Sequence, residues 1–495
     1  MLDLSLSFAT LNQSDRDLDA SAPPPPLPTY LPVLATQDAS YHLVTSTERL
    51  MPGYAGPLVN AGGLDLGGER VSPAAVQAAR GEAEAIRIAT LYDQTGSGRN
   101  YTQLTAPQQF ALSDLVRIGI ALPVIVDGRR SDGAGGVFRA MSAPAALTGR
   151  GFTRALVMEP TASIIPQLLG AVGGHLLYTY SLGPTDSPGY GSVEGGKVQL
   201  TAGGAVFDKM PASPCVLMLR ERADGCDLFF NGARVASAAV PSAEALTTLS
   251  LGANTGLETF NPNVRVLADV VVAGTLSDAD CIAVDGALRD RFDIAPWGTN
   301  ARVLLIGDSI AEGVATTLTR GIGHYARPLI DEATDWYVFA NARKFLAHCY
   351  RDSVAYEGQV DLPSSGRPIV SVIQGGINDI HAGGSGGATL YTDTTIPYVA
   401  YLKSLGHKVV VCTLLPQTAN VSPAIEAERQ AYNTAVRANG AGATAACDLA
   451  SNAAMGSYPA ATGDPTLYPN GIHPSSLGYS HLAATYAAAI NAVLL

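Results

Sequence analysis

Charged and aromatic residues are scarce in this chain of 495 amino acids, and what is missing excludes several functions. Asp, Glu, Lys and Arg make up 15% of the residues, and Phe, Trp and Tyr make up 7%. The net charge of −12, without a basic stripe, argues against nucleic acid as a partner. No apolar run is long enough to span a membrane, so we expect no membrane partner. The first residues also lack the basic start and long apolar core of a signal peptide.

The distribution of the cysteines gives no sign of a metal site or of disulfides. The six cysteines are scattered and form no CxxC pair, which indicates neither a zinc site nor a disulfide framework. Cys215 and Cys226 flank a predicted hairpin and could face each other, but we expect reduced thiols. His, Asp and Glu show no metal-ligand spacing, so we predict no metal and no cofactor.

Glycine (52) and proline (31) are abundant instead, and the length predicts two or three domains rich in loops. We divide the chain into an N-terminal anchor or oligomerisation segment (1–21), a Pro-rich linker (22–38), a β-sandwich (39–298) and an α/β domain (299–495). The first segment contains the alternating pattern LDLSLSF, typical of one strand that needs a partner. A disordered leader is the alternative for this segment.

Residues 39–298 have mostly β signals. The sequence CVLMLRERADGCDLFFNGARVAS (215–237) predicts strands joined by tight turns at Asp224-Gly225 and Asn231-Gly232. Residues 73–86 form an Ala-rich helical patch, and Ser277 is expected to cap a helix over 276–292. Short strands with polar turns favour an all-β, jelly-roll (concanavalin-like) sandwich.

Residues 299–495 instead alternate strands with helices. Buried strands are predicted at 303–306, 336–341, 369–374 and 408–416, with a weak fifth strand at 443–450. Such alternation predicts a doubly wound parallel sheet in an α/β/α arrangement. Ligands of such folds bind at the carboxyl ends of the strands.

Three polar residues follow predicted strands at that edge. Ser309 comes directly after the first strand in RVLLIGDSIAEG and is the candidate nucleophile. His473, before the last helix, is the candidate general base, and Asn378 carries an amide that can donate to an oxyanion. The order Ser, Asn, His on separate loops is a sharper signal than any one motif.

These residues resemble the SGNH/GDSL hydrolase family over 300–495. The matching blocks are GDS (307–309), GIND (376–379) and HP (473–474), the last followed by GY (478–479). The resemblance implies a flavodoxin-like fold and an ester substrate, often an acetyl ester on a sugar. It assigns Ser309 as nucleophile, His473 as base and Asn378 as oxyanion donor.

The sequence departs from this family at two positions. The oxyanion glycine of the second block is missing, and its place falls near Arg343 or Lys344, whose side chains could narrow the pocket or meet an anionic substrate. We expect N–H groups of Ser309, Arg343 and Gly376 to join Asn378 as oxyanion donors.

The second departure concerns the acid of the triad. The acid three residues before the histidine is replaced by Asn470, which cannot supply negative charge to the imidazolium. A Ser-His dyad, or a contribution from Asp464, are the alternatives to a weakened triad. His348, His381 and His481 are weaker candidates, and GGSGG (383–387) predicts either a flap or a plain loop.

The sandwich region has its own resemblance. LYDQTGSGRNYTQ (91–103) is similar to the Tyr-Asp-Gln-Ser-Gly-type signature of arabinofuranosidase-B-like modules, and the strand-then-helix end resembles concanavalin-A/laminin-G-like lectin domains. This implies a carbohydrate-facing surface, but no glycosidase acid pair aligns. We expect Asp93 and Gln94 to be structural.

The combined prediction is a serine esterase that removes ester groups, O-acetyl above all, from a polysaccharide of capsule or O-antigen type. The N-terminal strand, the proline spacer and the missing signal peptide resemble phage or prophage tail proteins. We therefore expect a virion-tail location, other tail proteins as partners and a homo-oligomer. The alternative is a non-catalytic receptor-binding virion protein with a degenerate hydrolase domain.

Overall fold

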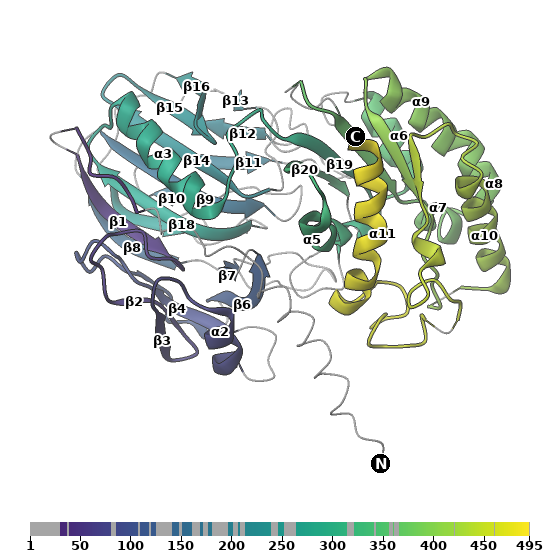
Figure 1. The fold of residues 1–495 in the computed structure, drawn as a ribbon, viewed down its shortest axis with the longest axis horizontal. Coiled ribbons are helices and arrows are strands. Elements are labelled where there is room, and N and C mark those ends of the chain that lie inside the picture. The colour runs from purple at the N-terminus through teal and green to yellow at the C-terminus, as the bar shows by residue number, and fades with distance from the viewer. Residues whose placement is uncertain are drawn as a thin grey trace, which may run out of the picture.

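The protein has two lobes side by side, a β-rich lobe and an α/β lobe (Figure 1). The computed structural model describes residues 30–36, 39–80, 86–106, 109–117, 120–124, 141–147, 151–160, 169–171, 177–180, 197–200, 206–207, 213–238, 246–251, 264–313, 321–340, 343–355, 360, 366–419, 421–459 and 461–494. The predicted anchor segment, 1–21, lies outside the described residues.

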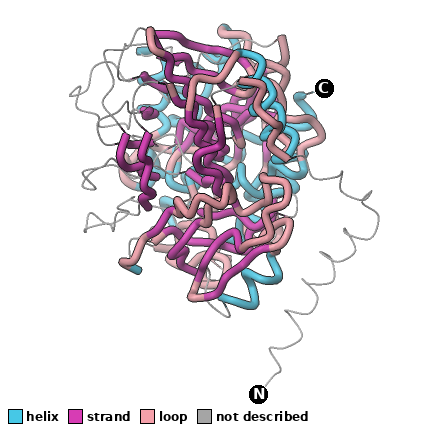
Figure 2. The backbone as a smooth tube through the Cα atoms, turned by 90° about the vertical axis from the view of Figure 1, so that its left-hand side faces the viewer, coloured by secondary structure: helices cyan, strands magenta, loops and turns pink. Residues whose placement is uncertain are grey.

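Two antiparallel sheets build the first lobe, which from its own side is seen to consist mostly of strands (Figure 2). In the described residues, the six-stranded sheet has the order β1 (Ser40–Ser46), β18 (Val264–Ala273), β9 (Phe152–Pro160), β14 (Cys215–Arg222), β15 (Gly225–Phe230), β16 (Ala233–Ala238). The described strands of the second sheet run in the order β13 (Val206–Phe207), β12 (Lys197–Leu200), β11 (Leu177–Tyr180), β10 (Leu169–Ala171), β17 (Leu246–Leu251), β8 (Met141–Leu147), β5 (Tyr101–Thr102), β4 (Ile86–Leu91), β2 (Pro57–Ala61), β3 (Leu64–Gly67), with β6 (Phe110–Arg117) and β7 (Ile120–Val124) paired beside β4.

Side-chain alternation gives the six-stranded sheet two buried faces. In β9, Leu156 and Met158 point into the core shared with the second sheet, whereas Ala155 and Val157 point outward. The outer side chains are covered by helix α3 (Asp278–Phe292), which packs its buried residues such as Leu288 against them. Burial on both faces explains why β14 reads as a continuous apolar run before its arginines.

Most predicted local signals of this lobe are confirmed, but the turn between β14 and β15 lies at Ala223-Asp224 and not at Asp224-Gly225, because Arg222 pairs with Gly225. The Asn231-Gly232 turn between β15 and β16 has positive φ at both residues, as a type I′ hairpin requires. Ser277 caps α3, with its side chain accepting the Asp280 N–H at 3.1 Å. The Ala-rich patch forms the short helix α2 (Pro73–Arg80).

The cysteines Cys215 and Cys226 do not face each other. Cys215 lies opposite Met158 at the start of β14, and Cys226 lies opposite Glu221 near the other end of the same strand. The hairpin register therefore separates them, and the Cys215 side chain is buried.

A buried ion pair that the sequence did not reveal lies inside the sandwich. Buried Arg154 donates to both carboxylate oxygens of Asp269, at 3.0 and 2.6 Å. The Tyr101 hydroxyl, from the second sheet, donates to Asp269 at 2.7 Å and accepts from Arg154 at 2.8 Å. Arg154 and Asp269 therefore compensate each other's charge, as buried ion pairs require.

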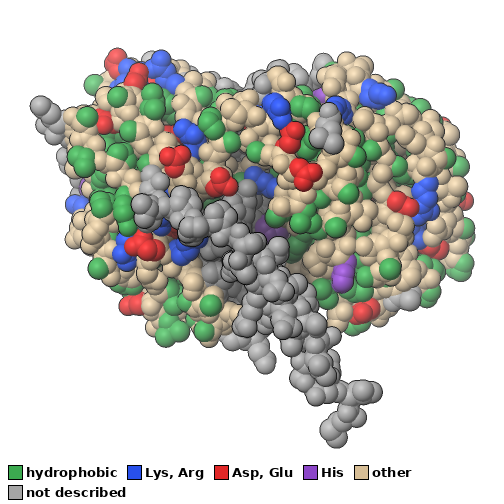
Figure 3. Space-filling model, viewed as in Figure 1, with side chains coloured by type: hydrophobic (Ala, Val, Ile, Leu, Met, Phe, Trp, Pro, Cys, Tyr) green, Lys and Arg blue, Asp and Glu red, His purple; other side chains and the backbone are tan. Residues whose placement is uncertain are grey.

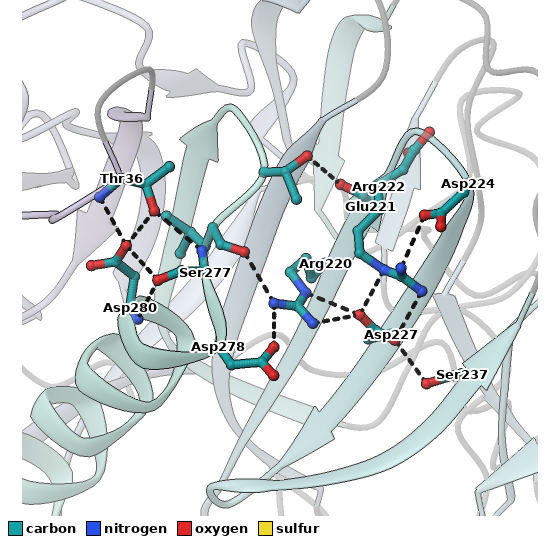
Figure 4. Close-up of polar contacts among 12 residues, drawn as sticks. Thr36, Arg220, Glu221, Arg222, Asp224, Asp227, Ser237, Ser277, Asp278 and Asp280 are labelled. Carbon is teal, nitrogen blue, oxygen red and sulfur yellow. Dashed lines mark hydrogen bonds and ion pairs between the residues drawn. The ribbon is translucent and has the colours of Figure 1, made fainter.

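A second network holds α3 to the sheet (Figure 4). Arg220 of β14 pairs with Asp227 of β15 at 2.7 Å and with Asp278, in the first turn of α3, at 2.6 Å. Asp280 in the same turn accepts the backbone N–H groups of Ala35 and Thr36. Residues 30–36, at the end of the predicted linker, are thereby fixed to the sandwich.

The second lobe contains a parallel sheet with helices on both sides (Figure 1). Its strands, counted over the described residues, have the order β20 (Thr334–Ala340), β19 (Ala301–Gly307), β21 (Ile369–Gln374), β22 (Lys408–Cys412), β23 (Ala445–Cys447). In chain order this is 2-1-3-4-5, the flavodoxin-like arrangement, and all five strands were predicted.

Helices cover this sheet and carry its connections. The described ones are α4 (Ser309–Glu312), α5 (Ile322–Ala326), α6 (Leu346–Ala355), α7 (Ile377–His381), α8 (Gly387–Leu390), α9 (Ile396–Ser404), α10 (Pro423–Arg437) and α11 (Ser476–Leu494), with a π-helical turn, Tyr391–Thr395, between α8 and α9. Helices α11 and α5 face the sandwich, and α6, α9 and α10 lie on the far side (Figure 1). No described helix combines the length and apolarity of a membrane span.

The two lobes contact each other directly beside the predicted boundary. Trp297 packs edge-on against Phe230 of the sandwich, with ring centres 4.9 Å apart, and its ring also lies under the Arg302 guanidinium. The Ser213 hydroxyl accepts the backbone N–H of Trp336 at 2.8 Å.

On the face shown in Figure 3, charged side chains are few and both signs are interspersed.

Candidate active site

The turn after β19 presents Ser309 at the carboxyl edge of the parallel sheet. All seven residues of β19 are buried, and the strand ends at Gly307, where a Cβ would lie 2.2 Å from the Gln374 carbonyl oxygen. Only glycine fits this close approach. Asp308 then caps α4 by accepting the Ile310 N–H at 2.9 Å, and Ser309 is the first helical residue. The predicted strand–turn–helix is confirmed.

His473 reaches Ser309 from the loop before α11. Its Nε2 lies 2.8 Å from the Ser309 Oγ. The loop is fixed by backbone hydrogen bonds, including Ser475 N–H to the Leu467 carbonyl at 2.8 Å. The structure thus brings together the candidate nucleophile and the candidate base at hydrogen-bond distance.

Tyr479 in α11 ties this helix to the nucleophile turn. Its buried hydroxyl donates to the Ile310 carbonyl at 2.6 Å, directly beside Ser309. The preceding Gly478 leaves no room for a Cβ, which would lie 2.8 Å from the Leu467 carbonyl. No role for this Gly-Tyr pair was predicted from the sequence. In the structure, the pair holds the helix after the base loop against the nucleophile turn.

Asn470 contacts His473 through its nitrogen rather than its oxygen. Its Oδ1 accepts the backbone N–H groups of Ile472 at 3.1 Å and His473 at 2.9 Å. Its Nδ2 then lies 3.0 Å from the His473 Nδ1. The ring nitrogen therefore faces an amide N–H₂ group, which donates, and not the amide oxygen.

The GIND block follows β21 and begins α7. The Asn378 side chain donates to the Lys344 carbonyl at 3.0 Å, which links this block to the loop after β20. Gly376 has φ 123°, a conformation that favours glycine. Asp379 accepts the N–H groups of Leu346 (2.7 Å) and Ala347 (3.1 Å) at the start of α6. The oxyanion roles of Asn378 and Gly376 stay predictions.

The second block contains a strained residue. Arg343 has φ 63°, the left-handed region, in the loop between β20 and α6, and its side chain is exposed. A glycine would adopt this conformation without penalty. Lys344 points the other way: its ammonium is buried, 3.6 Å from Asp352 and 3.7 Å from the Phe339 ring centre. An anionic substrate could therefore meet Arg343 but not Lys344.

Burial changes the protonation of the site. It raises the pKa of Asp308 to about 7, with the nearby charge of Asp379 acting in the same direction. Burial also lowers the pKa of His473, which favours the neutral ring.

The remaining candidates lie outside this hydrogen-bonded group. Asp464 accepts from the backbone and hydroxyl of Thr466, which holds it within its own turn. The His348 ring packs on Phe345 at a centre-to-centre distance of 5.0 Å, His381 ends α7, and His481 is exposed on α11. No group of metal ligands occurs among the described residues.

The GGSGG segment is held in place. The Ser385 N–H donates to the Asp379 carbonyl at 3.0 Å, and the Gly387 N–H donates to Glu428 at 2.8 Å. A Cβ on Gly387 would lie 1.8 Å from the Glu428 carbonyl oxygen, so the glycine permits close packing on α10. These contacts favour the plain loop over the flap.

Comparison with known proteins gives the α/β lobe a family. Residues 305–481 match the GDSL-like Lipase/Acylhydrolase family. A member of the lipolytic protein G-D-S-L family from Veillonella parvula DSM 2008 is 17% identical, with 37% of this chain and 95% of that chain covered and a TM-score of 0.30. The lipase/acylhydrolase from Enterococcus faecalis is 16% identical, with 39% and 95% covered and a TM-score of 0.30.

The β-rich lobe is similar to a different protein. An arabinofuranosidase complexed with arabinofuranosyl-alpha-1,2-xylobiose is 16% identical, with 51% of this chain covered and a TM-score of 0.35. The present chain spans 63% of that arabinofuranosidase. No curated protein matches the chain.

Proposed function

We propose that the C-terminal lobe, a GDSL-like lipase/acylhydrolase domain, is a serine esterase. The observation that carries this proposal is the 2.8 Å contact between the Ser309 Oγ and the His473 Nε2 at the carboxyl edge of the sheet. A nucleophile and a base within hydrogen-bond reach are what acyl transfer from an ester requires. The carboxyl edge of the sheet is where open α/β folds bind their ligands.

The reaction has two steps. The Ser309 oxygen bonds to the acyl carbon, its proton leaves for a base, and the bond to the alcohol breaks once that oxygen is protonated. Water then attacks the acyl-enzyme, releases the carboxylic acid and returns a proton to Ser309. His473, with its Nε2 2.8 Å from the Ser309 Oγ, can move these protons whenever Nε2 itself carries none.

The negative oxygen formed in each step needs donors. We assign this role to the Ser309 backbone N–H and the Asn378 amide, with the Arg343 N–H beside them in the neighbouring loop. The bond from Asn378 to the Lys344 carbonyl fixes the amide next to that loop. The backbone N–H of Gly376, which begins the same block as Asn378, is a further donor in this proposal.

We further propose that the ester is an O-acetyl group on a polysaccharide and that the sandwich binds the glycan. Support comes from the resemblances of both lobes in the sequence. The same reasoning extends to a virion-tail location and a homo-oligomer, carried by residues 1–38. Light scattering of the purified full chain, and detection of the protein in isolated virions, test these two points. A monomer absent from virions contradicts them.

The esterase proposal is tested with p-nitrophenyl acetate. Wild type should hydrolyse it faster than buffer, and Ser309→Ala should return the rate to background. Ser480→Ala is the matched control, because Ser480 is exposed on α11 and donates only within its own helix. Equal rates for wild type and Ser309→Ala would rule out the proposal. Acetate release from O-acetylated glycans then identifies the substrate.

A second function has one observation in its favour. The amide that replaces the family's acid turns its N–H₂ toward His473, an arrangement that does not activate a base. A receptor-binding protein without turnover would show this feature. It predicts glycan binding by wild type and Ser309→Ala alike, with no hydrolysis by either. Hydrolysis that depends on Ser309 excludes it.

A further inference from the structure

The orientation of the Asn470 side chain is determined by the backbone around it. The two N–H groups of Ile472 and His473 converge on one atom of the carboxamide, at 3.1 and 2.9 Å. Only the oxygen can accept them, because the amide nitrogen has no acceptor capacity. The N–H₂ group must therefore be the one that faces the ring of His473.

This orientation has a consequence for the ring. The Nδ1 of His473, 3.0 Å from the Asn470 nitrogen, has to accept a hydrogen bond and so carries no proton. A neutral imidazole without a proton on Nδ1 carries it on Nε2. That N–H then points at the Ser309 Oγ, 2.8 Å away.

We propose that Asn470 is a positioning residue that holds resting His473 as the Nε2–H tautomer, in which the ring donates to Ser309 and cannot take its proton. The proposal rests on the esterase function for its kinetic consequence, but the tautomer itself does not depend on it.

The proton balance shows what this does to the reaction. When the Ser309 oxygen bonds to the acyl carbon, its proton must go to a free lone pair, and Nε2 has none in this tautomer. Either the ring first loses the Nε2 proton to solvent and gains one at Nδ1, against the Asn470 N–H₂, or hydroxide takes the serine proton and becomes water. Both routes are slow at neutral pH, and the second accelerates with hydroxide concentration.

The other groups near the ring do not relieve this arrangement. Burial alone accounts for the lowered pKa of His473, so the ring stays neutral near neutral pH. Asp464, a carboxylate in the same loop, is bonded to Thr466. Asp308, the residue before the serine, accepts the backbone N–H of Ile310 with its carboxyl at 2.9 Å.

Asn470→Asp is the informative variant. One carboxylate oxygen keeps the two backbone N–H donors, and the other can accept from Nδ1–H, which moves the ring proton to Nδ1 and frees Nε2. The reverse change in a serine protease lowers kcat about 10⁴-fold. We expect Asn470→Asp to raise kcat for p-nitrophenyl acetate at least ~10²-fold, with a smaller change in KM.

The pH dependence of the rate distinguishes a change of the His473 tautomer from a purely structural effect of the substitution. The wild-type rate should keep rising with pH above the His473 pKa, because hydroxide supplies the base. The Asn470→Asp rate should level off above that pKa, because in this variant His473 supplies the base. Asn470→Ala is the matched control: it removes the amide without supplying a carboxylate, and should give less than a ~10-fold rise in kcat.

The direct test is nitrogen NMR of full-length protein carrying ¹⁵N-histidine, with the His473 signals assigned by loss in His473→Gln. Wild type should show the proton on Nε2, and Asn470→Asp should show it on Nδ1. A wild-type proton on Nδ1 overturns the proposal, as does an Asn470→Asp variant with unchanged tautomer or unchanged pH profile. If Ser309→Ala equals wild type while His473 is Nε2–H, the esterase function fails and the tautomer proposal stands.

Discussion

Ser309 and His473 lie 164 positions apart in the chain, yet the Oγ of one and the Nε2 of the other are 2.8 Å apart. Strand β19 delivers the serine and the loop before α11 delivers the histidine, and the Tyr479 hydroxyl bonds the two elements together at Ile310. The predictions for the site concern Asp308, next to the serine, and the neighbouring loops that carry Asn378 and Arg343.

Asp308 should make stability depend on pH. Its pKa is raised to about 7 in the folded protein, so between its ordinary value and 7 the folded state holds a proton that the unfolded chain has lost. Stability therefore falls as pH rises through this window. Asp308→Asn keeps the acceptor for the Ile310 N–H and removes the buried charge.

We expect Asp308→Asn to be more stable than wild type at about pH 8, on the order of a few kcal/mol, and nearly equal at about pH 4. Thermal unfolding of the full chain at both pH values measures this. Asp448→Asn is the control of opposite sign, because hydrogen bonds to Arg437 and Thr413 lower the pKa of Asp448 despite its partial burial. Parallel curves for Asp308→Asn and wild type would contradict the prediction.

Asn378 should act on the transition state. Removing an oxyanion donor costs about 10²–10³-fold in kcat in a serine protease, and we expect a loss of that order for Asn378→Ala with little change in KM. Because Asn378 also holds the Lys344 carbonyl, the unfolding temperature is measured alongside. A lowered unfolding temperature with unchanged kcat would make Asn378 purely structural.

Arg343 should be replaceable by glycine with a gain in stability. The other described non-glycine residues with positive φ are Asn231, Asp293 and Asn439, side chains that tolerate this conformation better than arginine does. Arg343→Gly relieves a strain of about 1 kcal/mol and keeps the backbone N–H.

The matched control is Arg351→Gly in α6, an exposed helical position where glycine should destabilise by about 1 kcal/mol. Activity on anionic and neutral esters is compared at the same time. If Arg343→Gly is as destabilising as Arg351→Gly, the conformation of Arg343 is not strained. A rise in KM confined to anionic esters would show that the guanidinium contacts substrate.

The sandwich should depend on one buried ion pair. Asp269→Asn leaves Arg154 charged in the core beside Tyr101, which we expect to cost about 3–5 kcal/mol. Glu332→Gln, which breaks the exposed pair with Arg367, should cost under ~1 kcal/mol. Chemical unfolding of the full chain measures both, and equal effects would contradict the account.

Much of the α/β lobe was predictable because its signals are local. The four apolar residues before Gly307 and the glycine itself predict a buried strand and a tight turn, and even the weak strand at Ala445–Cys447 was recognisable. Ser309, Asn378 and His473 were found because each follows a strand in a recognisable motif.

The contacts that decide chemistry were not predictable. Whether Asn470 offers its oxygen or its nitrogen to His473 depends on the conformation of the backbone at 472–473, which the sequence does not specify. The pairing of Arg154 with Asp269 joins residues 115 positions apart. Lys344 was expected to narrow the pocket or meet an anionic substrate, but its side chain is buried and its ammonium lies 3.6 Å from Asp352.

The most direct test of the account is the initial rate of p-nitrophenyl acetate hydrolysis by wild type and Ser309→Ala, measured side by side with Ser480→Ala. The account predicts a rate above buffer for wild type and Ser480→Ala, and the buffer rate for Ser309→Ala. Wild type and Ser309→Ala hydrolysing at the same rate would contradict it.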